Sequence, residues 1–400
     1  MQPRQQLPQT TRAFHDMDFD FTWILLGLPI AFTLGWLASR VDLRQLRIEN
    51  RQAPKAYFRG LNFLLNEQQD QAIDAFIEAV QNDPDTSELH FALGNLFRRR
   101  GEYERAVRVH EHLLQRGDLP QPDRDRAQHA LALDYLKAGL LDRAETALRK
   151  LEGTSFEEEA RLALLSIYER SRDWQHATDI ASKLDSAGHA SFSGRQAHYL
   201  CEQASSLLAT GDTSQAIALL ERACNIAPAS ARPLIDLAKL RQQQGQAQAA
   251  FDTLLKLEKA APQAMPLAAG LLVTLAQDDS LYAPVMAVLK AHYQLTPSVD
   301  VMDAIARLEK DPAASRQRYI QHLKTETSLV AAARWVAGEK LANPAEEHNH
   351  QLVQRALDQA TKPLMRYRCA ACGFEATQHF WHCPGCQAWD SYPARRIEEI

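Results

Sequence analysis

The sequence has few cysteines and no excess of positive charge. Six of its 400 residues are cysteine, and 45 lysines and arginines face 50 aspartates and glutamates, for a formal net charge of −5. Broad nucleic-acid binding needs a basic surface that displaces phosphate counterions, so the charge argues against that class of function. Cys201 and Cys224 lie far apart inside helical patterns. We therefore expect free buried thiols in a reducing compartment and no disulfide framework.

The sequence also lacks the common catalytic motifs. It contains no phosphate-binding Gly-Lys-Ser/Thr loop, no dinucleotide glycine fingerprint after a strand, no HExxH and no GxSxG. The histidines of HEH (110–112) do not share a helix face, and those of EEHNH (346–350) follow Pro344 in a polar segment, so we predict solvated side chains in both. Residues 98–100, all arginine, precede Gly101 and are interpreted as a helix end rather than a phosphate site. These observations predict a protein that is not an enzyme.

An uncharged segment near the N-terminus predicts one membrane span. Phe21 to Ser39 is free of charge over nineteen residues, which at about 1.5 Å per residue nearly matches a hydrocarbon core of ~30 Å. Trp23 and Trp36 lie near its ends, and a signal peptide is disfavoured because cleavage sites need a small residue where Trp36 stands. The basic residues that follow predict a cytoplasmic location for the rest of the chain: Arg40, Arg44, Arg47, Arg51, Lys55 and Arg59.

Small residues recur on one face of this predicted span. Gly27, Ala31 and Gly35 are spaced by four, an arrangement that lets a second transmembrane helix approach closely. Glycine is also common in membrane helices in general, so the pattern leaves both interpretations open. Residues 1–20 form an N-terminal extension that we expect to be disordered, and translation from either Met1 or Met17 fits the sequence.

The region from residue 53 to 262 repeats a helical pattern. Its marker is a small residue, an aromatic residue three positions later and an alanine twelve positions after the first, as in Gly60, Phe63 and Ala72. This is the tetratricopeptide pattern, in which small residues mark the close crossing of two antiparallel helices. Six units are predicted, with marker alanines at Ala72, Ala106, Ala144, Ala177, Ala216 and Ala250.

Glycines mark the predicted ends of the first helices of these pairs. Gly101, Gly139, Gly211 and Gly245 stand where a helix must stop, because glycine readily adopts the left-handed conformation of a helix C-terminus. Residues 263–362 are helical in texture but match the pattern loosely, and we interpret them as degenerate repeats. Such a solenoid has an extended concave surface suited to binding other proteins.

Four of the six cysteines form a paired cluster close to the C-terminus. Cys369, Cys372, Cys383 and Cys386 follow the pattern CxxC-x10-CxxC, which is typical of four thiolates around one zinc or iron ion. A disulfide pair is disfavoured in a reducing cytoplasm. A module as small as residues 363–400 needs a metal to fold stably, because it buries too little apolar surface. Its aromatic residues exceed what it can bury alone, so some should dock on the solenoid: Phe374, Phe380, Trp381 and Trp389.

The whole pattern resembles one protein family. The stretches GLNFLLNEQQDQAIDAF (60–76), GNLFRRRGEYERAVRVH (94–110) and DYLKAGLLDRAE (134–145), with YRCAACGF and WHCPGCQAW near the end, resemble the lipopolysaccharide assembly protein B family of Gram-negative bacteria. The resemblance runs from about Phe19 to the end of the chain. It implies an all-α tetratricopeptide solenoid with an N-terminal transmembrane helix and a C-terminal rubredoxin-like zinc-ribbon module. The sixteen residues before Met17 depart from the family, whose members usually lack them.

The resemblance also implies a function and a set of partners. Members of the family are single-pass proteins of the inner membrane that face the cytoplasm. They bring the deacetylase that commits precursor to lipid A to a membrane-bound AAA+ metalloprotease, so that lipopolysaccharide synthesis is limited. They answer to an inner-membrane regulator that monitors lipopolysaccharide, and they scaffold other lipopolysaccharide assembly proteins. By the same resemblance, the four paired cysteines are the ligands of one metal ion, iron or zinc.

Two other functions are compatible with the cysteine cluster. A rubredoxin-like electron-transfer protein carried on a tetratricopeptide scaffold would use a redox-active iron, although the sequence has no further cofactor motif. A nucleic-acid zinc ribbon is disfavoured because residues 366–400 have no basic patch. Self-association of the solenoid into a homo-oligomer is left open. The expected organisation is an extension (1–20), a transmembrane helix (21–39), a basic linker (40–52), six repeats (53–262), degenerate repeats (263–362) and the metal module (363–400).

Overall fold

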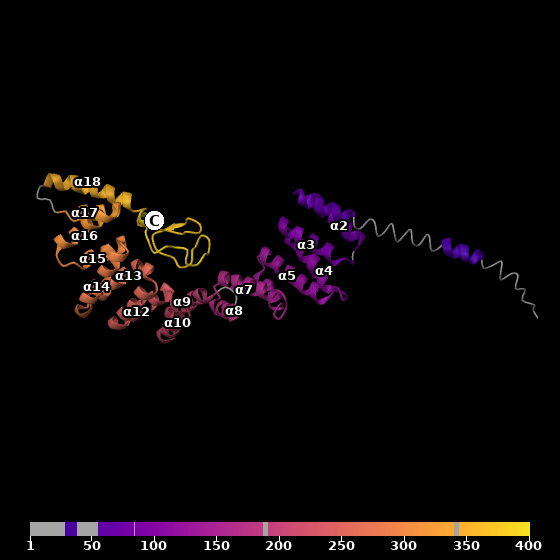
Figure 1. Ribbon diagram of the computed structural model, residues 1–400, viewed down its shortest axis with the longest axis horizontal. Helices are drawn as coiled ribbons and strands as arrows, with labels where there is room; N and C mark the ends of the chain where they lie inside the picture. The colour runs from indigo at the N-terminus through magenta and orange to yellow at the C-terminus, as the bar shows by residue number, and fades with distance from the viewer. Residues whose placement is uncertain (1–28, 38–54, 84, 187–190, 340–343) are drawn as a thin grey trace, which may run out of the picture. The chain divides into compact units, whose positions relative to one another are not determined.

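The computed structural model shows paired antiparallel helices followed by a small cysteine-rich module (Figure 1). The chain divides into two compact units, Met1–Phe156 and Glu157–Ile400. Most helices pack chiefly against a helix that is adjacent in the sequence, as expected of a solenoid. The structure describes residues 29–37, 55–83, 85–186, 191–339 and 344–400.

The first unit consists of helices joined by short turns. A helix over residues 55–65 packs with the labelled helices through a core that includes Phe76, Leu93 and Phe97. Successive helices α3, α4 and α5 contact one another in order. The labelled helices of this unit are α2 (Gln69–Asn82), α3 (Ser87–Arg100), α4 (Tyr103–Gln115), α5 (Gln121–Ala138) and α6 (Leu141–Arg149).

The second unit continues the helix pairs and ends in the cysteine-rich module. Its helices lie side by side in Figure 1, and its core includes a cluster from Leu234 to Leu308 and further clusters on either side of it in the sequence. Its elements are α7 (Glu157–Ser171), α8 (Trp174–Ser186), α9 (Ser193–Thr210), α10 (Thr213–Ile226), α11 (Ala231–Gln243), α12 (Ala247–Ala260), η1 (Pro262–Ala264), α13 (Met265–Leu275), α14 (Asp279–Leu295), α15 (Val299–Leu308), α16 (Pro312–Thr325), α17 (Leu329–Ala337), α18 (Pro344–Thr361), β1 (Tyr367–Arg368), β2 (Glu375–Ala376) and η2 (Ile397–Glu399).

The repeat markers lie where the helices cross. All six marker alanines are fully buried, because a larger side chain at these positions would separate the paired helices. The predicted helix ends are confirmed as well: Gly101, Gly139 and Gly211 terminate α3, α5 and α9 in the left-handed conformation, and Gly245 follows α11 in the same conformation. The marker alanines, each with 0% of its surface exposed, are Ala72, Ala106, Ala144, Ala177, Ala216 and Ala250.

Of the two histidines of the HEH motif, His112 is exposed as predicted, but His110 corrects the prediction. His110 on α4 is fully buried, not solvated, and its Nδ1 lies 2.5 Å from Oδ2 of Asp134 on α5. Residues 98–100 form the basic last turn of α3, which Gly101 ends as the sequence predicts, and Arg98 also binds Oδ1 of Asp134 through Nη1 at 2.8 Å. The segment 346–350 lies within the α-helix α18 and is not an irregular connection.

The predicted membrane span falls mostly outside the described residues. Residues 29–37 are helical with exposed side chains, among them Ala31 and Gly35, and an added Cβ at Gly35 would meet nothing within 4 Å. Residues 21–28, which include Gly27, residues 38–39, the extension 1–20 and the whole linker 40–52 lie outside the part of the chain that the structure describes. None of the helices in the described part has the length and hydrophobicity needed to cross a membrane.

Candidate metal centre

Two turns of the same design carry the paired cysteines. In the first, the amide of Gly373 donates to the carbonyl of Cys369 at 2.9 Å, and in the second, the amide of Gln387 donates to the carbonyl of Cys383 at 2.9 Å. Gly373 and Gln387 both have positive φ, at 77° and 60°, which reverses the chain just after each CxxC pair. A short antiparallel pairing of β1 with β2 closes the first turn.

The two turns bring the four cysteine sulfurs together. All four Sγ atoms lie within 4.8 Å of one another. The Sγ atoms of Cys369 and Cys386 are 3.8 Å apart, and those of Cys372 and Cys383 are 3.7 Å apart. A tetrahedron with metal–sulfur bonds of about 2.3 Å has sulfur separations of about 3.8 Å, so these distances suit four-coordinate zinc or iron. Cys369 and Cys383 are buried while Cys372 and Cys386 are exposed, so one side of the cluster faces solvent.

The surroundings of the buried cysteines favour the thiolate form that metals bind. Burial raises the pKa of Cys369, but the nearby Ser391 hydroxyl and two backbone N–H groups outweigh it and lower the pKa to about 6. Burial also raises the pKa of Cys383, and backbone N–H groups of its own turn lower it overall. A backbone N–H lowers the pKa of Cys372, yet burial and the neighbouring thiols outweigh it and raise that pKa to about 12. Ionisation of one thiol therefore disfavours ionisation of its neighbours, and a bound metal cation would offset this repulsion between thiolates.

Aromatic residues of the module dock on the solenoid, as the sequence predicts. The Trp389 ring stacks on His198 of α9, with centroids 4.8 Å apart and planes 21° apart, and its Nε1 donates to Oε1 of Glu169 on α7 at 3.0 Å. His198 is fully buried and binds Oδ2 of Asp390 through Nε2 at 2.8 Å. Trp381 packs against the core of α11 to α15. The helices thus bury apolar surface that the module cannot bury alone.

The last residues of the chain attach the module at a second place. Oε1 of Glu399 accepts from the amide of Val299 at 2.6 Å, at the start of α15, and Oε1 of Glu398 accepts from the amide of Val330 at 3.0 Å, near the start of α17. Arg396 forms a bidentate pair with Asp300 at 2.8 and 3.0 Å. No pattern in the sequence predicts this attachment. The sequence does show an acidic pair near the chain end, Glu398 and Glu399, but it does not indicate which helix starts these carboxylates bind.

Known protein families match both the helical repeats and the cysteine module of this chain. Residues 367–392 match the rubredoxin metal binding domain family, and residues 89–125 and 207–275 match tetratricopeptide repeat families. Lipopolysaccharide assembly protein B of Escherichia coli strain K12 is 30% identical over 404 residues, which cover 94% of this chain and 99% of that protein. The chain belongs to the lipopolysaccharide assembly protein B family.

Two further proteins are similar to this chain. The lipopolysaccharide assembly protein B of Haemophilus influenzae is 29% identical over 92% of this chain and 96% of its own length. Among solved structures, a tetratricopeptide repeat protein from Parabacteroides merdae is similar at 11% identity and a TM-score of 0.33, over 72% of this chain and 98% of that one. The fold predicted for a lipopolysaccharide assembly protein B, a helical tetratricopeptide solenoid with a C-terminal rubredoxin-like zinc ribbon, is confirmed.

Proposed function

We propose that this chain is a non-enzymatic adaptor in lipopolysaccharide assembly, held in the inner membrane by residues 21–39 with its bulk in the cytoplasm. One observation carries the proposal: the match to lipopolysaccharide assembly protein B of Escherichia coli covers 99% of that protein, so it includes the solenoid and the cysteine module together. A solenoid with an extended surface and a docked module is suited to holding partner proteins, which is the work of an adaptor.

The cysteine module contributes a metal-dependent docking unit to this adaptor. We assign Cys369, Cys372, Cys383 and Cys386 as ligands of one iron or zinc ion, supported by sulfur separations of 3.7 and 3.8 Å that suit a tetrahedral shell. The ion would supply folding energy to a module with little core of its own. The proposed organisation keeps the six repeats at 53–262, the degenerate repeats at 263–362 and the module at 363–400.

The adaptor's task is to limit lipopolysaccharide synthesis. We propose that it presents the deacetylase that commits precursor to lipid A to a membrane AAA+ metalloprotease, under the control of an inner-membrane regulator that monitors lipopolysaccharide. Anchoring would confine the adaptor to the membrane of the protease and so raise the effective concentration of one partner near the other. The small residues Gly27, Ala31 and Gly35 would pack against a partner's transmembrane helix.

Depletion of the protein in its native cell tests this function. The half-life of the deacetylase should lengthen after depletion and return to normal when the wild-type chain is expressed again. A chain with Gly27→Leu and Gly35→Leu should recover less of any membrane partner in pull-down, because larger side chains keep the helices apart. A deacetylase half-life that stays unchanged on depletion contradicts the adaptor function.

Electron transfer by a rubredoxin-like iron is the second candidate. It is favoured by the exposure of Cys372 and Cys386, which leaves one side of the cluster open to a redox partner. Purified protein that bleaches reversibly and turns over with a reductase would support it. A zinc-loaded protein that fully restores deacetylase turnover in depleted cells would rule electron transfer out as the required activity.

A further inference from the structure

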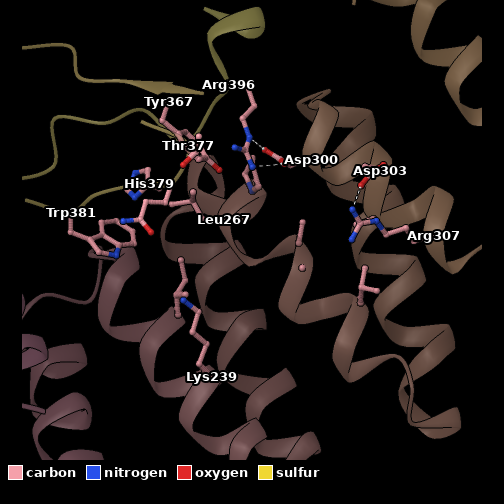
Figure 2. A pocket seen from close by; sticks show the side chains of 17 residues that line it. Lys239, Leu267, Asp300, Asp303, Arg307, Tyr367, Thr377, His379, Trp381 and Arg396 are labelled. Carbon is pink, nitrogen blue, oxygen red and sulfur yellow. Dashed lines mark hydrogen bonds and ion pairs between the residues drawn. The ribbon is translucent and has the colours of Figure 1, made fainter. Parts of the chain in front are cut away.

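A hollow lies between the cysteine module and the helices α11, α13 and α15. Its volume is about 540 Å³, within the range of ligand-binding clefts. Ile235 and Lys239 of α11 and Gly270 of α13 line it from the solenoid, while Thr377 and Trp381 line it from the module. Figure 2 shows Lys239 on the helix side and the module residues above it. The site therefore exists only while the module is docked.

Of the three cations that line the hollow, one has no ion-pair partner within 4 Å among the described residues, although it lies close enough to Asp236 on its own helix to lower in part the pKa that burial raises for that carboxylate. Arg396 is paired with Asp300, and Arg307 is paired with Asp303 at 2.6 Å, as the dashed lines in Figure 2 mark. Within the described residues, Lys239 forms no ion pair within 4 Å and no hydrogen bond, and its side chain is exposed. Three cations thus face two carboxylates, and the Lys239 ammonium keeps three unused donors.

The remaining lining combines apolar surface with free hydrogen-bonding groups. Trp381 and Leu267 provide partly exposed apolar surface beside Lys239. The side chains of Thr377 and Gln378 make no hydrogen bond within the described residues and are exposed. Burial lowers the pKa of His379 and so disfavours its charged form, although the hydrogen bond that its Nε2 donates to the Tyr392 carbonyl at 3.0 Å raises this pKa in part.

We propose that this hollow binds an extended peptide segment of a partner protein through an acidic side chain held by Lys239 and an adjacent apolar side chain held against Trp381. The inference rests on the proposed adaptor function and gives it a specific contact. The exposed lining residues make the hollow an open groove, which suits a chain segment better than an enclosed small molecule. Thr377 and Gln378 are placed to hydrogen-bond the peptide backbone.

The test is an unbiased selection on the full-length, metal-loaded chain in detergent. Random hexapeptides with acetylated N-termini and amidated C-termini are screened, so that side chains supply the only carboxylates. The wild-type chain should enrich Asp or Glu next to an apolar residue. Lys239→Glu should bind the best peptide about tenfold or more weakly and should enrich Lys or Arg instead, because the charge in the groove is reversed.

Two further variants separate binding from folding. Gly270→Leu should abolish binding, because an added Cβ at Gly270 meets nothing within 4 Å and the larger side chain would occupy the hollow. Leucine is also a better helix former than glycine, so the fold should be retained. Lys259→Glu, on the exposed surface of α12 outside the hollow, is the matched control and should bind like the wild type. Metal content and thermal midpoint are measured for every variant.

The outcomes distinguish this inference from the proposed function. Selection without acidic enrichment, or equal affinity in the wild type, Lys239→Glu and Gly270→Leu, overturns the peptide groove. Those results leave the deacetylase half-life experiment untouched, since it depends on the whole adaptor. Loss of binding in Lys239→Glu and Gly270→Leu, with metal content and thermal midpoint at wild-type values and Lys259→Glu unaffected, establishes the groove.

Discussion

At the scale of single residues, the buried pair of His110 and Asp134 dictates the size of its neighbour. The ring of His110 is held by Asp134, which is itself fully buried and bound by Arg98. The ring lies against Gly94 of α3, where an added Cβ would be 2.5 Å from its Nε2. The small residue of the repeat marker is therefore required here by a polar side chain and not only by the crossing of two helices.

Substitution of this glycine tests the constraint. Gly94→Ala should lower the free energy of unfolding by about 1–3 kcal/mol, because the ring held by Asp134 cannot move away from the new methyl group. The control is Gly194→Ala in α9, where an added Cβ meets nothing within 4 Å. That change should leave stability equal or raise it by up to about 1 kcal/mol through helix propensity. Urea unfolding followed by circular dichroism measures both, and equal stability of the two variants contradicts the constraint.

At the scale of elements, α15 and α17 begin with caps from two sources. Locally, the Ser298 and Ser328 hydroxyls accept from the amides of Val301 and Ala331 at 3.3 and 2.9 Å, as serine does at many helix starts. The C-terminal tail, residues 396–400, adds the carboxylates of Glu399 and Glu398 to the same helix starts, where negative charge is favourable. Burial raises the pKa of Glu399, although amides that donate to it lower the pKa in part. The tail thus stabilises two helices through contacts far apart in the sequence.

Removal of the tail charges tests this capping. Glu398→Gln combined with Glu399→Gln should lower the free energy of unfolding of the second unit by about 1–2 kcal/mol, since charge-assisted bonds to helix starts are weakened. Hydrogen exchange should quicken at the amides of Val299 and Val330, while the metal stays bound. Glu346→Gln, an exposed change at the start of α18, serves as the control and should leave this exchange unchanged. Wild-type exchange in the double variant would show that the tail is not needed.

At the scale of the second unit, the cysteine module contacts helices that lie far apart in the sequence. Trp389 reaches Glu169 on α7, 220 residues earlier, and the tail reaches the starts of α15 and α17. Solenoid repeats otherwise depend mainly on their nearest neighbours. A single small module therefore couples helices from α7 to α17, and the groove at Lys239 lies within the region that it covers (Figure 2).

Loss of a proposed ligand should release this coupling. Cys372→Ser is expected to lose the metal, undock Trp389 and expose a new protease site after Lys362, because the module has too little core to stay folded. Metal analysis, tryptophan emission and limited proteolysis measure the three effects. Cys224→Ser is the control: burial raises the pKa of this thiol to about 11, and it lies outside the cluster. Full metal stoichiometry in Cys372→Ser contradicts the ligand assignment.

Features that depend on neighbours in the chain can be inferred from the amino-acid sequence. The marker alanines, the helix-ending glycines and the CxxC spacing each reflect contacts within one repeat or one turn, so their pattern could be interpreted without coordinates. The repeat boundaries stay predictions. The burial of His110, the capping of two helices by residues 398 and 399 and the groove beside Lys239 are visible only in the folded chain. These features join side chains from distant segments, and their positions follow from how the helices and the module pack rather than from any local pattern.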